Sequence, residues 1–204
     1  MARVFVLIED QAGRQTGRGV DFTGVLSYVL RDAGPSHWRG TCGLTLPVES
    51  AAAEMTHTYQ TAHLGGVRRG PKSKKPVLPA DLGWHTSDHA WHTYEHHKET
   101  VHQALKMMGL IDRQAVWVAH TDTGRPHVHI VANLVHPITG DIARLGLIKK
   151  RMSTFCGNYE KRLGDIRCSK RFEPKLANEN RQRLPKPPRA PDKLKASFPL
   201  ASRP

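Results

Sequence analysis

The sequence predicts an α+β fold, in which separate helices accompany antiparallel strands. Two apolar runs, residues 115–119 and 128–135, flank the turn sequence Thr-Gly-Arg-Pro at 123–126 and therefore predict an antiparallel hairpin. Elsewhere, apolar residues recur at helical spacing in segments that end at glycine or proline.

Two strands and two helices are expected in the first half of the chain. They are a strand at 3–8, a helix at 22–31, a strand at 38–46 and a helix at 47–62. Gly34 and Pro35 stop the pattern of the first helix, and Pro47 suits the first turn of the second. Gly65 and Gly66 then end that second helix.

The second half is expected to add a strand, a helix, the hairpin and a last helix. These elements are a strand at 77–85, a helix up to Met108, the two hairpin strands and a helix at 143–163. Pro79 makes residues 77–85 a poor strand, because proline lacks a ladder donor. Thr86 or Ser87 is the expected cap of the following helix, and Gly109 ends it.

Charge and composition narrow the class of partner. The 204 residues include 31 Lys and Arg against 18 Asp and Glu, a net charge of +13, which favours nucleic acid or an anionic membrane as partner. No apolar run reaches the length of a spanning helix, and residues 4–8 are too short for a signal peptide. The 3 cysteines are too few for a disulfide framework, so reduced thiols are expected.

The composition changes near Glu173. Residues 173–204 contain eight Lys or Arg, three acids and half of the 14 prolines. Such a segment is expected to be a basic, proline-rich tail or linker. The sequence therefore predicts a domain at 1–172 followed by a tail at 173–204.

Three histidines are expected to converge at the hairpin. His127 and His129 lie two apart on a strand and so share a face, and the hairpin returns His120 to the same neighbourhood. Three imidazoles on one face can bind a divalent metal with open coordination positions. Asp122 is placed to orient one of the rings from behind.

A second group of histidines is expected to lie on a solvated helix face. Its members are His85, His89, His92, His96, His97 and His102. Two His-x-x-x-His pairs occur among them, but neither has the glutamate that follows the first histidine of zinc proteases.

A metal on a basic protein suggests chemistry on a phosphodiester, which then needs a nucleophile. Tyr59, Tyr94 and Tyr159 fall on apolar helix stripes and are expected in the core. Tyr28 lies one position off its stripe and is expected to project from the core. Tyr28 is therefore the candidate nucleophile. The residues leave open whether His120 is a metal ligand, the base that takes the phenol proton, or both.

The motif around these histidines resembles the third motif of plasmid conjugative relaxases. It reads His120-x-Asp122-Thr-x3-His127-Val-His129-Ile-Val-Ala-Asn133, then Val-His136-Pro137-x-Thr139-Gly140. The resemblance is to HUH endonucleases, and within them to mobilisation proteins typified by the IncP-plasmid relaxase. Ser27-Tyr28-Val29-Leu30 resembles the first motif, which carries the nucleophilic tyrosine. In the second motif, Gly83 stands where the family has a serine that contacts DNA.

This resemblance implies a fold and an activity. The fold is a central antiparallel sheet flanked by helices. The activity is metal-dependent nicking at the nic site of a plasmid's origin of transfer, through a 5′-phosphotyrosyl intermediate and later rejoining. The implied cofactor is Mg²⁺ or Mn²⁺, with Zn²⁺ as an alternative. The implied partners are single-stranded or supercoiled plasmid DNA, accessory relaxosome proteins and a type IV secretion coupling protein. No membrane insertion is expected, and the implied location is the bacterial cytoplasm, with transfer to the recipient on the DNA.

DNA binding also needs basic side chains. Those expected to supply charge lie in the loop 65–76 and are Arg68, Arg69, Lys72, Lys74 and Lys75. Three other functions remain as alternatives: a replication-initiator HUH nuclease, a metal-stabilised DNA-binding protein without catalysis, and a protein bound to anionic membrane. In the first, the tyrosine usually follows the histidines, whereas Tyr28 precedes them.

Overall fold

A computed structural model describes residues 3–5, 19–31, 38–62, 73–85, 92–120, 126–166 and 168, with residues 3–5 described by their backbone alone. Among these residues, five strands pair antiparallel in the order β1-β3-β5-β4-β2. The strands are β1 Arg3–Phe5, β2 Arg39–Cys42, β3 Val77–Gly83, β4 Ala115–His120 and β5 His127–Asn133. The α+β class and the central antiparallel sheet predicted from the sequence are confirmed.

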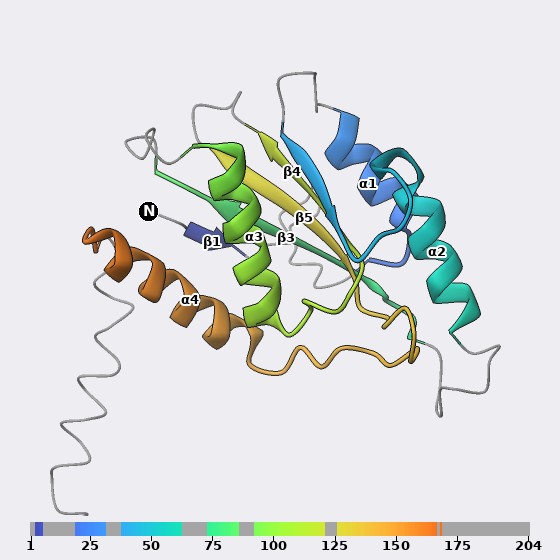
Figure 1. The fold of residues 1–204 in the computed structure, drawn as a ribbon. Coiled ribbons are helices and arrows are strands. Elements are labelled where there is room, and N and C mark those ends of the chain that lie inside the picture. The colour runs from blue at the N-terminus through green and yellow to red at the C-terminus, as the bar shows by residue number, and fades with distance from the viewer. Residues whose placement is uncertain are drawn as a thin grey trace, which may run out of the picture. The chain divides into compact units, whose positions relative to one another are not determined.

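Helices cover both faces of the sheet (Figure 1). They are α1 Phe22–Arg31, the short 3-10 turn η1 Val48–Ser50, α2 Ala51–Thr61, α3 Tyr94–Met108 and α4 Ile148–Leu163. Alternate residues of β4 divide the core: Val116 and Val118 pack beneath α1 and α2, whereas Trp117 packs beneath α3 and α4. Both faces of β4 are therefore buried, which explains its nearly continuous apolar sequence.

The predicted hairpin is present and fixes the register of the site. β4 pairs with β5 so that His120 lies opposite His127 and Val118 lies opposite His129. β3 pairs with the other edge of β5, with Asp81 opposite His129 and Gly83 opposite His127. These residues therefore share one face of the sheet, the face that α1 and α2 cover.

Residues 77–83 form a full strand, contrary to the prediction of a poor one. Among the described residues, β1 pairs with Asp81 to Gly83 and does not reach Pro79, so no described strand on that side needs a donor from the proline. On the other side, Pro79 pairs in register with Val131. Pro79 is therefore compatible with this strand in the part of the sheet that the structure describes.

Two predicted helix starts are wrong. α3 begins at Tyr94, and its cap is the Thr93 side chain, which accepts from the His96 backbone N–H at 3.2 Å. Thr86 and Ser87, the expected caps, lie outside the described residues. α4 begins at Ile148 instead of residue 143, because the chain first pairs with the end of β5 through an N–H···O bond from Ala143 to Leu134.

The described residues end at Cys168, so the predicted tail at 173–204 lies outside them and the predicted domain boundary stays a prediction. In the part of the chain that the structure describes, no helix is long and apolar enough to cross a bilayer.

Candidate metal centre and its neighbouring tyrosine

His120, His127 and His129 form a cluster at the end of the β4–β5 hairpin, as the sequence predicts. One potential ligand atom from each ring lies within 4.8 Å of the other two. The Nε2 atoms of His127 and His129 are 3.1 Å apart, and the ring centroids of the three lie 4.7 to 5.3 Å from one another. His120 is buried, and the other two rings are half-buried.

This donor set fits a divalent metal ion. Two imidazole nitrogens bound tetrahedrally at about 2.05 Å would lie about 3.3 Å apart, close to the 3.1 Å between His127 and His129. Three neutral nitrogen ligands leave coordination positions for a substrate oxygen. The cluster could therefore hold a metal ion.

Two contacts outside the cluster orient its rings. The Nδ1 atom of His129 is hydrogen-bonded to the carboxylate of Asp81 on the neighbouring strand, which leaves Nε2 directed at the cluster. The Nε2 atom of His120 lies 3.2 Å from the carbonyl oxygen of Val29 on α1. A carbonyl oxygen only accepts, so Nε2 carries the proton there and Nδ1 is the nitrogen with a lone pair.

Sequence reasoning missed Asp81. The expected orienting carboxylate, Asp122, lies outside the described residues. Asp81 is the only charged residue in the strand Val-Leu-Pro-Ala-Asp-Leu-Gly. It lies two positions before Gly83, so the two residues share a face of the sheet, and this spacing could have indicated Asp81 from the sequence. Gly83 itself lies opposite His127, so it leaves a position without a side chain beside that ring.

Tyr28 projects from the core, as predicted. Phe22, Leu26 and Val29 bury the inner stripe of α1, whereas the Tyr28 side chain is 59% exposed. The guanidinium carbon of Arg31, one helical turn later, lies 5.4 Å from the centre of the Tyr28 ring. Tyr28 also precedes Val29, whose carbonyl oxygen contacts His120, so the exposed phenol belongs to the helix that touches the cluster.

The predicted basic loop is described only at its end. Lys74 and Lys75 are exposed, and the Tyr59 hydroxyl donates to the Ser73 carbonyl oxygen at 2.8 Å, which ties this end of the loop to α2. The other three cations expected to contact DNA lie outside the described residues and are Arg68, Arg69 and Lys72.

Comparison with protein families gives one decisive finding. Residues 28–164, more than half of the 204-residue chain, match the model described as relaxase, MobA/VirD2-like, nuclease domain. The chain belongs to the relaxase family. The match begins at Tyr28 and includes the three clustered histidines. Comparison with curated proteins and with solved structures gives no match.

Membership in this family supports a DNA-nicking function and makes DNA the partner of this relaxase. The match does not separate the IncP type from other relaxases, so that finer likeness stays a prediction. The histidine cluster agrees with the divalent metals that relaxases use, without identifying the ion.

The end of the third-motif sequence, residues 136–140, forms a turn in this relaxase. The Nδ1 atom of His136 accepts from the backbone N–H groups of Ile138 and Thr139 at 3.0 and 3.1 Å. Its Nε2 atom lies 3.4 Å from a carboxylate oxygen of Asp112. Gly140 follows in the left-handed conformation, with φ of 67°. These residues shape the chain after β5, at the opposite end of the strand from His127.

The second group of histidines is not a solvated face, contrary to the prediction. His97 is fully buried and stacks on Trp84, with ring centroids 4.7 Å apart. The His97 Nε2 atom lies 3.3 Å from Nδ1 of His92, and His96 is half-buried. His85 and His102 are exposed, and His89 lies outside the described residues. Trp84, which follows β3, packs against His97 and so buries this face of α3. The sequence of the helix alone does not reveal that contact.

Tyr159 is a core residue of the same region, as predicted. It is 3% exposed, its hydroxyl accepts from the Trp84 indole N–H at 2.9 Å, and it donates to His96 Nε2 at 2.6 Å. Burial raises the pKa of the Tyr159 hydroxyl, with the Trp84 hydrogen bond and Arg162 acting in the opposite direction. Tyr159 is therefore a poorer nucleophile candidate than the exposed Tyr28.

Proposed function

We propose that this relaxase cuts one DNA strand at the nic site of an origin of transfer, with Tyr28 as nucleophile and the histidine cluster as metal site. The observation that carries the proposal is the contact between His120 Nε2 and the Val29 carbonyl oxygen, 3.2 Å apart. It ties the helix of the exposed tyrosine to the predicted ligands.

In the proposed reaction, the Tyr28 hydroxyl oxygen attacks the scissile phosphorus. A bond forms between that oxygen and phosphorus, and the bond from phosphorus to the 3′ oxygen breaks. The phenol proton leaves, and the 3′ oxygen gains a proton to become a free hydroxyl. The product is a 5′-phosphotyrosyl link, which the 3′ hydroxyl later attacks to rejoin the strand.

The chain's own residues hold the reacting groups. His120, His127 and His129 would hold the ion, and Asp81 orients the His129 ring. A divalent ion there, Mg²⁺ or Mn²⁺ and alternatively Zn²⁺, would polarise a phosphoryl oxygen and stabilise its charge. His120 acts as a ligand or as the acceptor of the phenol proton, since its ring contacts the helix of Tyr28.

The remaining partners are inferred from the family. Basic side chains of the loop 65–76 bind the backbone of single-stranded or supercoiled plasmid DNA, and residues 173–204 add non-specific affinity. Accessory relaxosome proteins and a secretion coupling protein complete the proposed assembly, which would form in the bacterial cytoplasm.

The test is incubation with supercoiled plasmids that carry candidate origins. We expect relaxation that becomes visible after SDS and protease treatment, that EDTA abolishes and that Mg²⁺ or Mn²⁺ restores. A polymerase should extend the free 3′ end, because the protein blocks the 5′ end. Full cleavage by metal-stripped protein, or DNA that is bound without any covalent adduct across the candidate origins, would contradict the proposal.

A further inference from the structure

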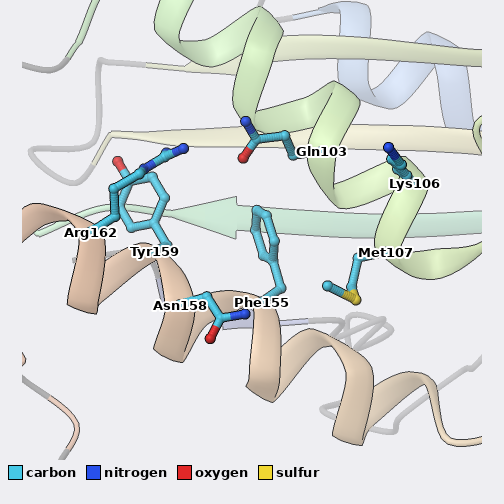
Figure 2. Close-up of a pocket in the computed structure, with 7 residues that line it drawn as sticks. All are labelled: Gln103, Lys106, Met107, Phe155, Asn158, Tyr159 and Arg162. Atoms are coloured by element: carbon cyan, nitrogen blue, oxygen red, sulfur yellow. The ribbon is translucent and has the colours of Figure 1, made fainter.

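A groove lies between α3 and α4 (Figure 2). These two helices cover the sheet face opposite the histidine cluster. Its volume is about 290 Å³. The residues that line it are Gln103, Lys106, Met107, Phe155, Asn158, Tyr159 and Arg162. None of them belongs to the proposed nicking site.

The floor of the groove is apolar and its edges carry amides. Met107 and Phe155 supply the floor, and Phe155 is held in place by the core, with 5% of its surface exposed. Gln103 and Asn158 stand on the two helices that form the walls (Figure 2). Asparagine and glutamine amides can both donate to and accept from the edge of a nucleobase.

Cations stand at both ends of the groove. Figure 2 shows Lys106 of α3 at one end and Arg162 of α4 at the other. The guanidinium carbon of Arg162 lies 5.5 Å from the centre of the Tyr159 ring, which holds this charge beside the groove.

The exposed surface of α4 is also basic. Its exposed charged residues are Lys149, Lys150, Lys161 and Arg162. The one acid of the helix, Glu160, is fully buried and accepts from the Cys168 backbone N–H at 3.3 Å. On α3, Glu99 is exposed and accepts from the Gln103 amide at 2.7 Å, so one carboxylate also lies beside the groove, where the exposed cations Lys106, Lys161 and Arg162 outnumber it. The charge around the groove therefore suits an anionic ligand.

We infer that this groove is a second binding site for single-stranded DNA. A base enters the groove over Met107 and Phe155, the amides of Gln103 and Asn158 meet its edge, and Lys106 and Arg162 bind flanking phosphates. The volume is near the lower end of the range for ligand pockets, about 300 Å³, which suits one base. A duplex is less suited, because its bases are paired and stacked. The inference rests on the proposed action on single-stranded DNA, and it gives the relaxase a site for that strand away from Tyr28.

Photocrosslinking tests the site directly. The full chain is mixed with an oligonucleotide that contains 4-thiothymidine and lacks any nic sequence, in EDTA, then irradiated and digested. We expect crosslinked peptides from α3 and α4, around Met107 and Phe155, in addition to any from the nicking site. Crosslinks confined to α1 and the hairpin would overturn the inference. Crosslinking needs no cleavage, so the absence of nicking and the absence of crosslinks in the groove are separate results.

Charge variants give the matched comparison. Lys106→Gln/Arg162→Gln removes two cations of the groove. Arg39→Gln/Lys98→Gln removes two exposed cations that do not line it: Arg39 pairs with Glu49, and Lys98 lies on α3 near Cys42. Crosslinking in the groove is measured across a salt series, and the slope of log affinity against log salt concentration is compared. The groove double variant should have a slope shallower by about 1.4, because each lost contact to a single-strand phosphate contributes about 0.7. The control should leave the slope unchanged, and equal losses in both would overturn the inference.

A last pair of ligands separates base recognition from charge. Wild type should bind oligo-dT about tenfold more tightly at the groove than an abasic oligomer with the same phosphates. Asn158→Ala, which removes one of the two amides proposed to meet the base edge at an exposed position, should weaken that preference. Equal binding of the abasic oligomer by wild type, tighter binding of a blunt duplex, or equal competition by polyglutamate would each overturn the single-strand assignment.

Discussion

His120 and Val29 lie in contact although 91 positions separate them, with 3.2 Å between the imidazole Nε2 and the carbonyl oxygen. The hydrogen bond fixes the His120 tautomer and joins α1 to the face of the sheet that carries the histidine cluster. Since Val29 directly follows Tyr28, a shift of α1 that moved the phenol would also strain this contact. A backbone contact thus fixes the position of the helix that carries the predicted nucleophile relative to the predicted ligands.

Tyr28→Phe should abolish cleavage and the covalent adduct, because no oxygen remains to attack phosphorus. The side chain is 59% exposed, so the free energy of unfolding and metal affinity should change little. Gel analysis of the adduct, with peptide mass spectrometry of the wild-type linkage, measures the first effect. A nucleotide found on any other residue would refute the assignment.

Tyr159→Phe is the matched control with the opposite expectation. It leaves the Trp84 indole N–H and the His96 ring without their shared partner inside the core. We expect a loss of about 1–3 kcal/mol in the free energy of unfolding, with the adduct retained. Tyr59→Phe and Tyr94→Phe should retain the adduct too. An active Tyr28→Phe beside an inactive but folded Tyr159→Phe would exchange the roles of the two tyrosines.

Replacing His127 or His129 by alanine should weaken metal binding far more than replacing His92 or His96. The first pair belongs to the cluster whose ligand atoms lie within 4.8 Å of one another. The second pair bonds to His97 and Tyr159 and has a structural role instead. Titration calorimetry with Mn²⁺ on folded variants measures the difference, and equal losses in both pairs would show that the wrong cluster was chosen.

Asp81→Asn should lower metal affinity by about 10- to 100-fold, because the carboxylate that orients His129 is lost while the side-chain shape is kept. Asp112→Asn is the matched control: its carboxylate lies beside His136, 3.4 Å away, at the other end of β5. The control should bind metal as wild type does. Equal affinity of Asp81→Asn and wild type would remove Asp81 from the metal site.

The histidine cluster could be predicted because its geometry is local. The spacing of His127 and His129 places both on one face, and a short turn is enough to return His120. The exposure of Tyr28 was equally local, since it depends on one position in a helical stripe. The α+β class was predicted from patterns that are equally local, the helical spacing of apolar residues and the apolar runs of the hairpin strands.

Contacts between distant strands could not be predicted in this way. Asp81 reaches His129 only through the register of β3 on β5, 48 positions apart, and periodicity does not encode that pairing. The burial of His97 has the same origin, because Trp84 covers it from another element. The strand through Pro79 pairs with β5, and the sequence of residues 77–83 alone did not reveal that partner.

Deleting residues 173–204 should weaken non-specific DNA binding and spare the nicking of a short single-stranded nic oligonucleotide. The deletion removes eight basic and three acidic residues, a net of +5 from the total of +13. Filter binding across a salt series should show a shallower slope, since fewer counterions are released. Loss of nicking in a truncated protein that still folds would place this segment in the catalytic domain.

The buried His97 should make the relaxase lose stability in mild acid. Burial, followed by the nearby His92 and His96, lowers the pKa of His97 to about 4 in the folded chain. An unfolded histidine has a pKa of about 6.5. The neutral ring is therefore favoured by folding, so the stabilisation is fully present above pH 6.5 and is lost as the pH falls toward 4, by at most about 3 kcal/mol. Burial also lowers the pKa of His96, which adds to the loss in the same direction.

Urea unfolding at several pH values between 7 and 4 measures this effect, and two variants isolate it. His97→Gln removes the titrating ring, so its free energy of unfolding should fall less steeply with acid, whatever its stability at pH 7. His102→Gln makes the same change at an exposed position of α3 and should keep the wild-type slope. If the slope of His97→Gln matched that of wild type, the acid sensitivity would lie in other groups, and His97 would be protonated in the core without cost. If only His97→Gln makes the free energy of unfolding fall less steeply with acid, the loss of stability is assigned to the His97 ring, which stacks on Trp84. His97 is buried and His102 is exposed, and the two variants make the same replacement.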